Sequence, residues 1–433
     1  MSKNPNIILF ITHDQGQYIG CYDSPQTPNS LKTPNLDKLA KNGVRFTNYF
    51  CTAPQCSPSR GSIQTSLYPH QNGLMGLVNL GWTLPEWNNA LPMYLKENGY
   101  STHLLGLQHE TFNAKLLGYD TISKRGPEFK YSCRKMEDTY FEFISDHAKD
   151  TRPFYACIGT IEVHLPFYAW AQPVNPDKVK VPPFLPDHES VRKNLAEFYG
   201  VIQHVDNTVG KINAYLEDKG LKEDTLFIFT TDHGFPFPRA KCTLYDPGIK
   251  TSLLMSHPHS EAFSGGKVFN QMISNIDLLP TIIEYIGGKE LKGVEGRSFM
   301  SITTESNEKF RPDIFTEKTY HEIYDPIRAV RAEQFKYIYN FEASNTQYQI
   351  PLDIMREPSG QLMKKSYNKP RSKEEFYDLK KDPNELTNLI GNNNYQDVIL
   401  ELKAKLINWM KQTKDPILNG KIKDQRKEPP RRY

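Results

Sequence analysis

Short apolar runs alternate with amphipathic stretches along the chain from Asn6 to Thr231, and this alternation limits the folds open to it. The apolar runs predict strands at Asn6–Thr12, Val44–Phe50, Ser101–Leu105, Phe154–Gly159 and Leu226–Thr231. Periodicity and capping signals predict helices from Pro34 to the glycine at 43, and over Ser59–Leu67, Ala90–Asn98, Tyr140–Ala148 and Leu195–Leu216. The pattern indicates an α/β fold with a mostly parallel sheet flanked by helices.

Chemically active side chains follow several of these predicted strands. They are Asp14, His109, His164, Asp232 and His233. In doubly wound sheets, ligands bind beyond the carboxyl ends of the strands. We therefore expect these side chains to converge on one site.

The composition changes at about Ser301. Charged stretches with short aromatic runs, such as Phe335–Tyr339, predict antiparallel strands, and Tyr395–Lys411 predicts a helix with one apolar face. We expect three parts: a catalytic α/β domain over residues 1–300, a smaller C-terminal α+β domain over 301–420, and a flexible basic tail over 421–433.

Charge and hydropathy exclude several partners. The chain has 53 Lys plus Arg and 50 Asp plus Glu, and the last eleven residues hold five basic and two acidic side chains, so the rest is neutral. Nucleic acid is therefore not an expected partner. Apolar runs are too short for a membrane span. The five apolar residues Ile7–Ile11 are fewer than the ~7–15 of a secretory signal, so we expect a cytoplasmic protein.

Six cysteines in a chain of 433 residues do not indicate a disulfide framework. One of them, Cys56, begins the segment Cys56-Ser57-Pro58-Ser59-Arg60, which resembles the signature of the sulfatase family. Other segments resemble that family in its order: His13-Asp14, Gly106–His109, His164–Pro166, Thr231–Gly234, Lys241, Leu244–Gly248 and Phe376–Leu379. Within the family, the chain is similar to the sulfamidases at His70–Gly73, Phe235–Pro238, His321-Glu322 and Trp409.

The resemblance implies an alkaline-phosphatase-like fold and a nucleophile made from Cys56. A maturation enzyme would oxidise the thiol to formylglycine, whose hydrate attacks sulfur and then expels sulfate with its second hydroxyl. Arg60 would hold the formylglycine hydroxyl. Lys241, His109 and His164 would bind sulfate oxygens or protonate the leaving group.

The resemblance also implies a divalent metal held by Asp14, His13, Asp232, His233 and the residue at Cys56. Carboxylate oxygens favour calcium. However, His13 stands where the sulfamidases have Asp and His233 where they have Asn, and imidazole shifts the preference toward manganese or another transition metal. The Asp232-His233 pair resembles the phosphonate monoester hydrolase and choline sulfatase branches of the superfamily.

A third departure is Leu107, which stands where the family usually has a lysine. It removes a positive charge expected near the sulfate, and Gln108 beside it offers only a neutral donor. We expect substrate contacts instead from His321, Glu322, Arg328 and Arg331 of the second domain, for which a solvated charged surface is an equal alternative.

The expected function is removal of sulfate from a small sulfated amino sugar, such as N-sulfoglucosamine, in glycosaminoglycan degradation. Three alternatives stay open. They are cleavage of an O-sulfate from a sugar, hydrolysis of a phosphonate or phosphodiester, and a non-catalytic binding protein in which Cys56 keeps its thiol.

Overall fold

The computed structural model describes residues 4–23, 30–86, 89–123, 131–167, 171–304, 309–342, 350–367 and 370–425. Its larger sheet has eight strands in the order β4-β3-β5-β1-β6-β7-β2-β8. The strands are β1 Asn6–Thr12, β2 Val44–Phe50, β3 Ser101–Gly106, β4 Thr121–Ile122, β5 Phe154–Gly159, β6 Thr225–Thr231, β7 Lys250–Ser256 and β8 Lys267–Ser274. Among these eight, β7 runs antiparallel to its neighbours β6 and β2, and the other recorded pairings are parallel.

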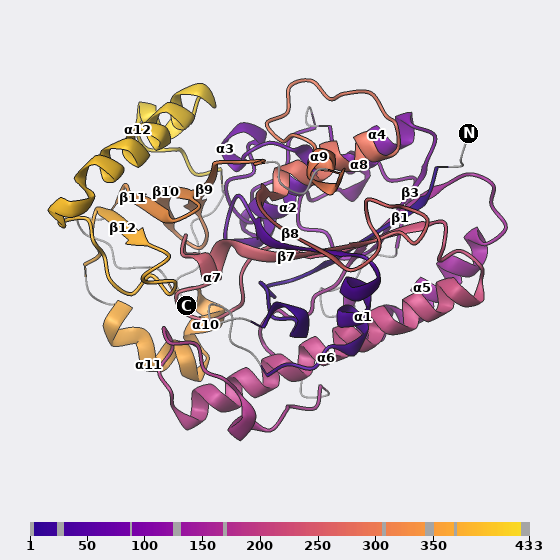
Figure 1. Ribbon diagram of the computed structural model, residues 1–433, viewed down its shortest axis with the longest axis horizontal. Coiled ribbons are helices and arrows are strands. Elements are labelled where there is room, and N and C mark those ends of the chain that lie inside the picture. The colour runs from indigo at the N-terminus through magenta and orange to yellow at the C-terminus, as the bar shows by residue number, and fades with distance from the viewer. Residues whose placement is uncertain are drawn as a thin grey trace.

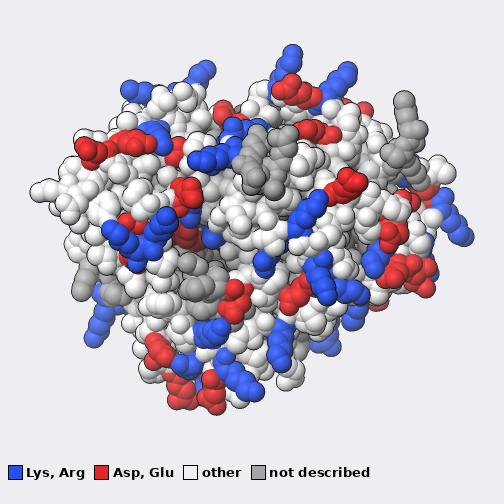
Figure 2. Space-filling model, in the orientation of Figure 1, with Lys and Arg blue, Asp and Glu red and all other residues white. Residues whose placement is uncertain are grey.

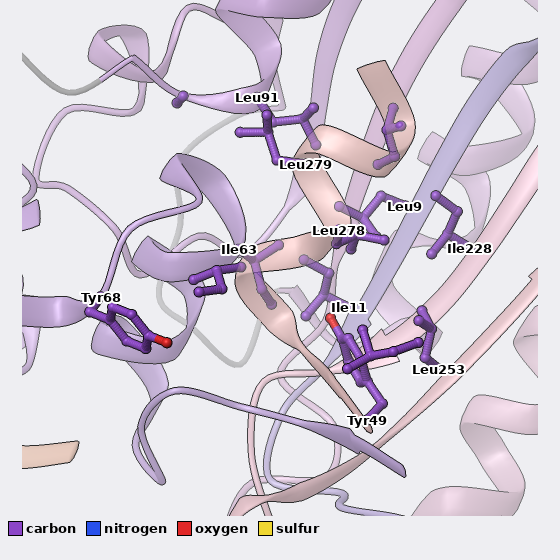
Figure 3. Close-up of a cluster of buried hydrophobic side chains, with 14 of the residues drawn as sticks. Leu9, Ile11, Tyr49, Ile63, Tyr68, Leu91, Ile228, Leu253, Leu278 and Leu279 are labelled. Atoms are coloured by element: carbon purple, nitrogen blue, oxygen red, sulfur yellow. The ribbon is translucent and has the colours of Figure 1, made fainter. Parts of the chain in front are cut away.

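Helices cover both faces of this sheet (Figure 1). On one face lie α1 Pro34–Asn42, α5 Cys133–His147 and α6 Glu189–Asp218; on the other lie α2 Cys56–Thr65, α4 Leu91–Glu97, α8 Leu278–Tyr285 and α9 Met300–Thr304. Successive side chains of a strand point to opposite faces, so β1 contributes to two cores. Leu9 and Ile11 pack with Ile63 and Leu278 (Figure 3), whereas Phe10 packs on the face of α1 and α6.

A second sheet has the antiparallel order β12-β11-β10-β9. Its strands are β9 Asp313–Tyr320, β10 Tyr324–Ala332, β11 Phe335–Asn340 and β12 Glu374–Asp378. The amphipathic helix α12, Gln396–Gln412, packs against β10 and β11, and its Trp409 stacks on Phe315 with ring centroids 5.0 Å apart. The predicted fold, a mostly parallel sheet followed by a small antiparallel sheet with a terminal helix, is confirmed.

Short elements complete the described chain. The remaining α-helices are α3 Pro69–Asn72, α7 Asp246–Ile249, α10 Leu352–Met355 and α11 Pro358–Tyr367. The 3₁₀ helices are η1 Gly20–Tyr22, η2 Val78–Leu80, η3 Ala114–Leu117, η5 Pro176–Lys178, η6 Asn275–Asp277, η7 Asn393–Tyr395 and η8 Pro416–Asn419. The segment with α10 and α11 leaves the second sheet between β11 and β12 and returns to the catalytic part, where α11 contacts α6.

The two sheets share a hydrophobic cluster, which contains Leu9 of β1 together with Val330 of β10 and Leu406 of α12. The division near residue 300 therefore stays a prediction, and residues 426–433 of the predicted tail lie outside the described residues. Figure 2 shows acidic and basic side chains interspersed over the face it presents. Within the described chain, no helix combines the length and apolar character needed to cross a membrane.

Candidate active site

Four adjacent parallel strands deliver the predicted residues to one edge of the sheet. In the order β3-β5-β1-β6, the strands are followed by His109, His164, Asp14 and Asp232. The imidazole of His13 lies 5.0 Å from that of His109 and 5.3 Å from that of His164, measured between ring centroids. The convergence expected from the strand ends is therefore present.

Two buried carboxylates form the centre of this cluster. Asp232 Oδ1 accepts hydrogen bonds from the backbone N–H groups of Asp14, at 2.9 Å, and His233, at 2.8 Å. Asp14 Oδ1 lies 2.9 Å from His233 Nε2, and Asp232 Oδ2 lies 3.2 Å from His13 Nδ1. Burial alone would raise the pKa of the Asp14 carboxyl. Lys241 and the neighbouring imidazoles have the opposite effect and hold this pKa well below its usual value. The neighbouring groups also lower the pKa of Asp232, although burial opposes this effect. Both carboxylates are therefore ionised at neutral pH.

Cys56 lies at the first residue of α2 and faces this centre. Its Sγ is 3.5 Å from His233 Nε2 and 3.8 Å from Asp14 Oδ1, and the side chain is buried. Burial and the negative charge of Asp14 raise the pKa of the thiol well above its ordinary value. An unmodified Cys56 is therefore a protonated thiol and a poor nucleophile.

Arg60 lies one helical turn after Cys56 and is also buried. Its Nε donates to Asp232 Oδ2 at 3.0 Å, and its Nη2 donates to the carbonyl of Thr12 at 3.1 Å. Burial opposes the charge of the guanidinium, but Asp232 raises its pKa. Arg60 thus fixes α2, and with it Cys56, against the ends of β1 and β6.

Lys241 is buried at the opposite side of Asp14. Its ammonium group lies 2.6 Å from Asp14 Oδ2, 2.8 Å from Asp353 Oδ2 and 3.1 Å from His164 Nε2. Burial would lower the pKa of Lys241, but the two carboxylates raise it well above its usual value. A permanent positive charge therefore stands beside His164, at a position that can attract an anion.

The donor set fits a divalent metal ion. Ligand atoms of His13, Asp14, Cys56 and Asp232 lie within 4.8 Å of one another. His13 Nε2 is buried without a hydrogen-bond partner, and burial lowers the pKa of His13 to about 3. A neutral imidazole and two ionised carboxylates are the protonation states in which these groups bind metals.

The loop after β3 contains a buried acid that the sequence did not reveal. Glu110 accepts a hydrogen bond from the backbone N–H of His109 at 2.8 Å, and burial raises the pKa of its carboxyl.

Leu107 is buried in the hydrophobic cluster on the α6 face. The side chain of Gln108 donates to the carbonyl of Thr111 at 2.7 Å, so its neutral donor serves its own loop.

Residues of the second domain divide between the site and the interior. Glu322 binds His321 through Oε2 at 2.6 Å and accepts the backbone N–H of Leu352 through Oε1 at 3.0 Å. These two residues thus anchor α10, which carries Asp353 to Lys241. Sequence analysis missed Asp353, since it lies 112 positions from Lys241 and no motif surrounds it.

The substrate contact expected from Arg328 is not supported by its position. Its side chain is fully buried and binds Asp415 through Nε at 2.6 Å and Nη2 at 3.1 Å, with Glu317 at 3.2 Å from Nε. Arg331 is likewise buried and paired with Asp246 at 3.2 Å. Arg328 is held in the interior by two carboxylates, which need a positive counter-charge there. Its role is therefore to stabilise the packing of the second sheet.

Comparisons with known proteins agree with this geometry. The sulfatase family model matches residues 5–288, and the model of the N-sulphoglucosamine sulphohydrolase C-terminal region matches residues 232–374. An ulvan-active sulfatase of Formosa agariphila is 29% identical over 95% of this chain and 75% of its own length. Human N-sulphoglucosamine sulphohydrolase is 28% identical over 95% of this chain and 91% of its own length.

A solved structure of a protein in complex with its substrate D-glucosamine-2-N,6-O-disulfate has the same fold. The TM-score is 0.73 with 18% sequence identity, covering 98% of this chain and all of the other. The fold and the site define a hydrolase of sulfate esters or sulfamates. The chain belongs to the sulfatase family.

Proposed function

We propose that the protein removes sulfate from a small sulfated amino sugar, with N-sulfoglucosamine as the first candidate and a nucleophile derived from Cys56. The proposal rests on the position of Cys56 Sγ, which lies 3.5 Å from His233 Nε2 and 3.8 Å from Asp14 Oδ1. The nucleophile position thus adjoins both the candidate metal ligands and the buried cations. The relatives that act on sulfated sugars support this substrate class.

Formylglycine formed from Cys56 by a maturation enzyme supplies a geminal diol that attacks sulfur and afterwards releases sulfate by rebuilding the aldehyde. Arg60 holds the start of α2 in place through Asp232. Lys241 contributes positive charge to the sulfate oxygens. His164 Nε2, which accepts from Lys241 Nζ at 3.1 Å, takes up a proton from Lys241 and passes it to the leaving nitrogen or oxygen. His109, in the loop after β3, lies on the same side of the site, with its ring centroid 5.0 Å from that of His13.

Asp14, Asp232, His233 and His13 would hold the metal ion, which supplies positive charge that stabilises the transferring sulfuryl group. Calcium is the family expectation for carboxylate ligands. His233 Nε2 lies 2.9 Å from Asp14 Oδ1, and this nitrogen donor keeps manganese or another transition metal as the alternative to calcium. The cytoplasmic location and the absence of nucleic-acid and membrane partners stay predictions.

Two alternatives follow from the same site. A sugar O-sulfate requires no change in the residues, because only the leaving atom differs. The imidazole of His233 beside Asp14 favours a phosphonate or phosphodiester as the second candidate. Turnover of an aryl sulfate against the matched aryl phosphonate distinguishes the two.

Mass spectrometry of the peptide that contains Cys56, purified from cells with an active maturation enzyme, tests the nucleophile. We expect the thiol to be replaced by an aldehyde or its hydrate, and Cys56→Ala to abolish sulfatase turnover while thermal unfolding is unchanged. Cys157→Ala is the matched control, because Cys157 is a buried thiol of β5 outside the cluster. An unmodified thiol at Cys56, or full activity of Cys56→Ala, contradicts the proposal and favours the binding-protein alternative.

A further inference from the structure

All three hydrogen atoms of the Lys241 ammonium group already have acceptors in the protein. A lysine carries three N–H donors, and Asp14, Asp353 and His164 stand 2.6, 2.8 and 3.1 Å from its Nζ. Asp14 belongs to the candidate metal ligands and His164 to the leaving-group side. Asp353 has no role in the function proposed above, although it contacts the ammonium group of Lys241 and the imidazole of His164.

A carboxylate in an anion-binding site needs a physical reason. Asp353 Oδ2 lies 2.8 Å from Lys241 Nζ and 3.5 Å from His164 Nε2, so it faces the two side chains that bind sulfate and protonate the leaving group. Its side chain is 22% exposed, whereas those of Lys241 and Asp14 are 1% and 0% exposed. Asp353 thus lies at the open edge of the site, where the part of the substrate next to the sulfate must lie.

The protein holds Asp353 firmly in this place. Its Oδ1 accepts the backbone N–H of Ile354 at 2.9 Å, and Ile354 packs in a small apolar cluster with Leu165, the neighbour of His164. Glu322 fixes the preceding residue through the backbone N–H of Leu352. Oδ2 receives Lys241, which leaves lone pairs of the carboxylate for a further donor.

We propose that Asp353 is a specificity-determining residue that selects substrates with an N–H or O–H donor beside the scissile bond and rejects those with a second anion there. The inference rests on the proposed function and narrows its substrate class to compounds such as amino sugars with one sulfate and a neighbouring hydroxyl or amine. A donor on the substrate forms a charge-assisted hydrogen bond with the carboxylate. A second carboxylate or sulfate in that position meets a like charge, which costs affinity.

Two aryl sulfates that differ in the group ortho to the ester test this inference: 2-hydroxyphenyl sulfate and 2-carboxyphenyl sulfate. The ratio of their kcat/KM values is measured for the wild type and for Asp353→Asn. We expect the variant to lower the preference for the hydroxyl compound about tenfold, since the amide is neutral. Comparing ratios cancels the different intrinsic reactivities of the two esters.

Two control variants separate specificity from a general effect. Asp353→Glu keeps the charge and should keep the preference. Glu357→Gln removes a carboxylate from the same segment, but that group accepts a hydrogen bond from Asn194 Nδ2 at 2.8 Å; its ratio should equal that of the wild type. An unchanged ratio in Asp353→Asn overturns the inference and leaves the proposed function intact, whereas a wild type that hydrolyses neither aryl sulfate nor N-sulfoglucosamine overturns the proposed function and the inference with it.

A second measurement needs no variant and covers the case in which Asp353→Asn fails to fold. Repulsion between Asp353 and an ortho carboxylate at a partly exposed site is screened by salt. The preference of the wild type for the hydroxyl compound should therefore fall as the ionic strength rises. A preference that is independent of salt contradicts the inference.

Discussion

Two buried lysines have almost the same surroundings and belong to different parts of the molecule. Lys241 lies between Asp14 and Asp353 at 2.6 and 2.8 Å. Lys336 of β11 lies between Asp246 and Glu385 at 2.6 and 2.7 Å, with the carbonyl of Leu244 at 3.1 Å. Both ammonium groups thus have two carboxylates and a third acceptor.

The two lysines differ in access to solvent. Around Lys241, the side chains of His164 and Asp353 are 25% and 22% exposed. Around Lys336, Glu385 is fully buried and Asp246 is 15% exposed. Under the proposed function, the same ion-pair chemistry serves substrate binding where one side is open. Around Lys336, where it is closed, it joins the second sheet to the larger sheet's part of the molecule.

The flanking acids also differ in charge. Burial opposes ionisation of Asp353, but Lys241 and His164 lower its pKa to about 2. Burial raises the pKa of Glu385 to about 7, with the neighbouring Asp246 carboxylate acting in the same direction against Lys336. Lys241, at the solvent-accessible site, thus keeps two charged partners near neutral pH. Lys336, in the interior, has one partner, Glu385, that takes up a proton.

Lys336→Met should have the largest effect on stability. The change leaves the carboxylates of Asp246 and Glu385 without their shared counter-charge in the interior, and breaking a buried ion pair costs about 3–5 kcal/mol of unfolding free energy. Urea unfolding of the variant measures this. A loss below 1 kcal/mol by the same method, roughly that of a surface ion pair, would contradict a structural role.

Lys241→Met makes the same chemical change at the open site. We expect kcat/KM for a sulfate ester to fall about 100-fold, equal to about 2.7 kcal/mol of transition-state stabilisation. Its unfolding free energy should fall by less than in Lys336→Met, because Asp353 reaches water and the proposed metal ion would give Asp14 a second counter-charge. Equal losses of stability in the two variants would remove the distinction between the lysines.

Removal of the metal ion tests that counter-charge directly. A chelator should lower the unfolding free energy of the wild type by about 2 kcal/mol, the size expected for a ligand at roughly 30–100 times its Kd. In Asp232→Asn, metal content and activity should fall together, and the chelator should have a smaller effect. Elemental analysis and thermal unfolding supply the readouts; unchanged metal content in Asp232→Asn would mean that the ligand set is wrong.

Local sequence patterns sufficed to predict much of the catalytic sheet. The predicted strands Asn6–Thr12, Val44–Phe50 and Phe154–Gly159 have the observed bounds. The first and third are buried almost throughout and read as continuous apolar runs, whereas Val44–Phe50 mixes buried and half-buried positions. The helix expected from Tyr140 begins at Cys133 and the one expected from Ser59 begins at Cys56. The first turns of both helices contain few apolar residues. The periodic apolar pattern therefore did not indicate where these helices begin. Strands β7 and β8 were not predicted.

The site was predicted as far as its residues follow strands or lie in family motifs. Asp14, Cys56 and Asp232 meet as expected, whereas Glu110, Asp353 and the placement of Arg328 depend on tertiary contacts. Asp353 comes to Lys241 because α10 packs beside Leu165 and is held by Glu322. A charged residue on β10 can point to solvent or to an interior partner, and Asp415, in the segment after α12, determines the second outcome for Arg328.

Glu385→Gln should have the smallest effect near pH 8 and a larger effect at lower pH. The pKa of Glu385 is raised from 4.5 to about 7 by folding, so its contribution is fully present below pH 4.5 and is lost as the pH rises through 7. The difference in unfolding free energy between wild type and Glu385→Gln should shrink by about 2.5 kcal/mol from pH 5 to pH 8. Asp353→Asn is the matched control: the pKa of Asp353 lies near 2, so its difference from the wild type should be constant over this range. Parallel pH profiles for both variants would show that the closed lysine holds two charged partners, as the open one does.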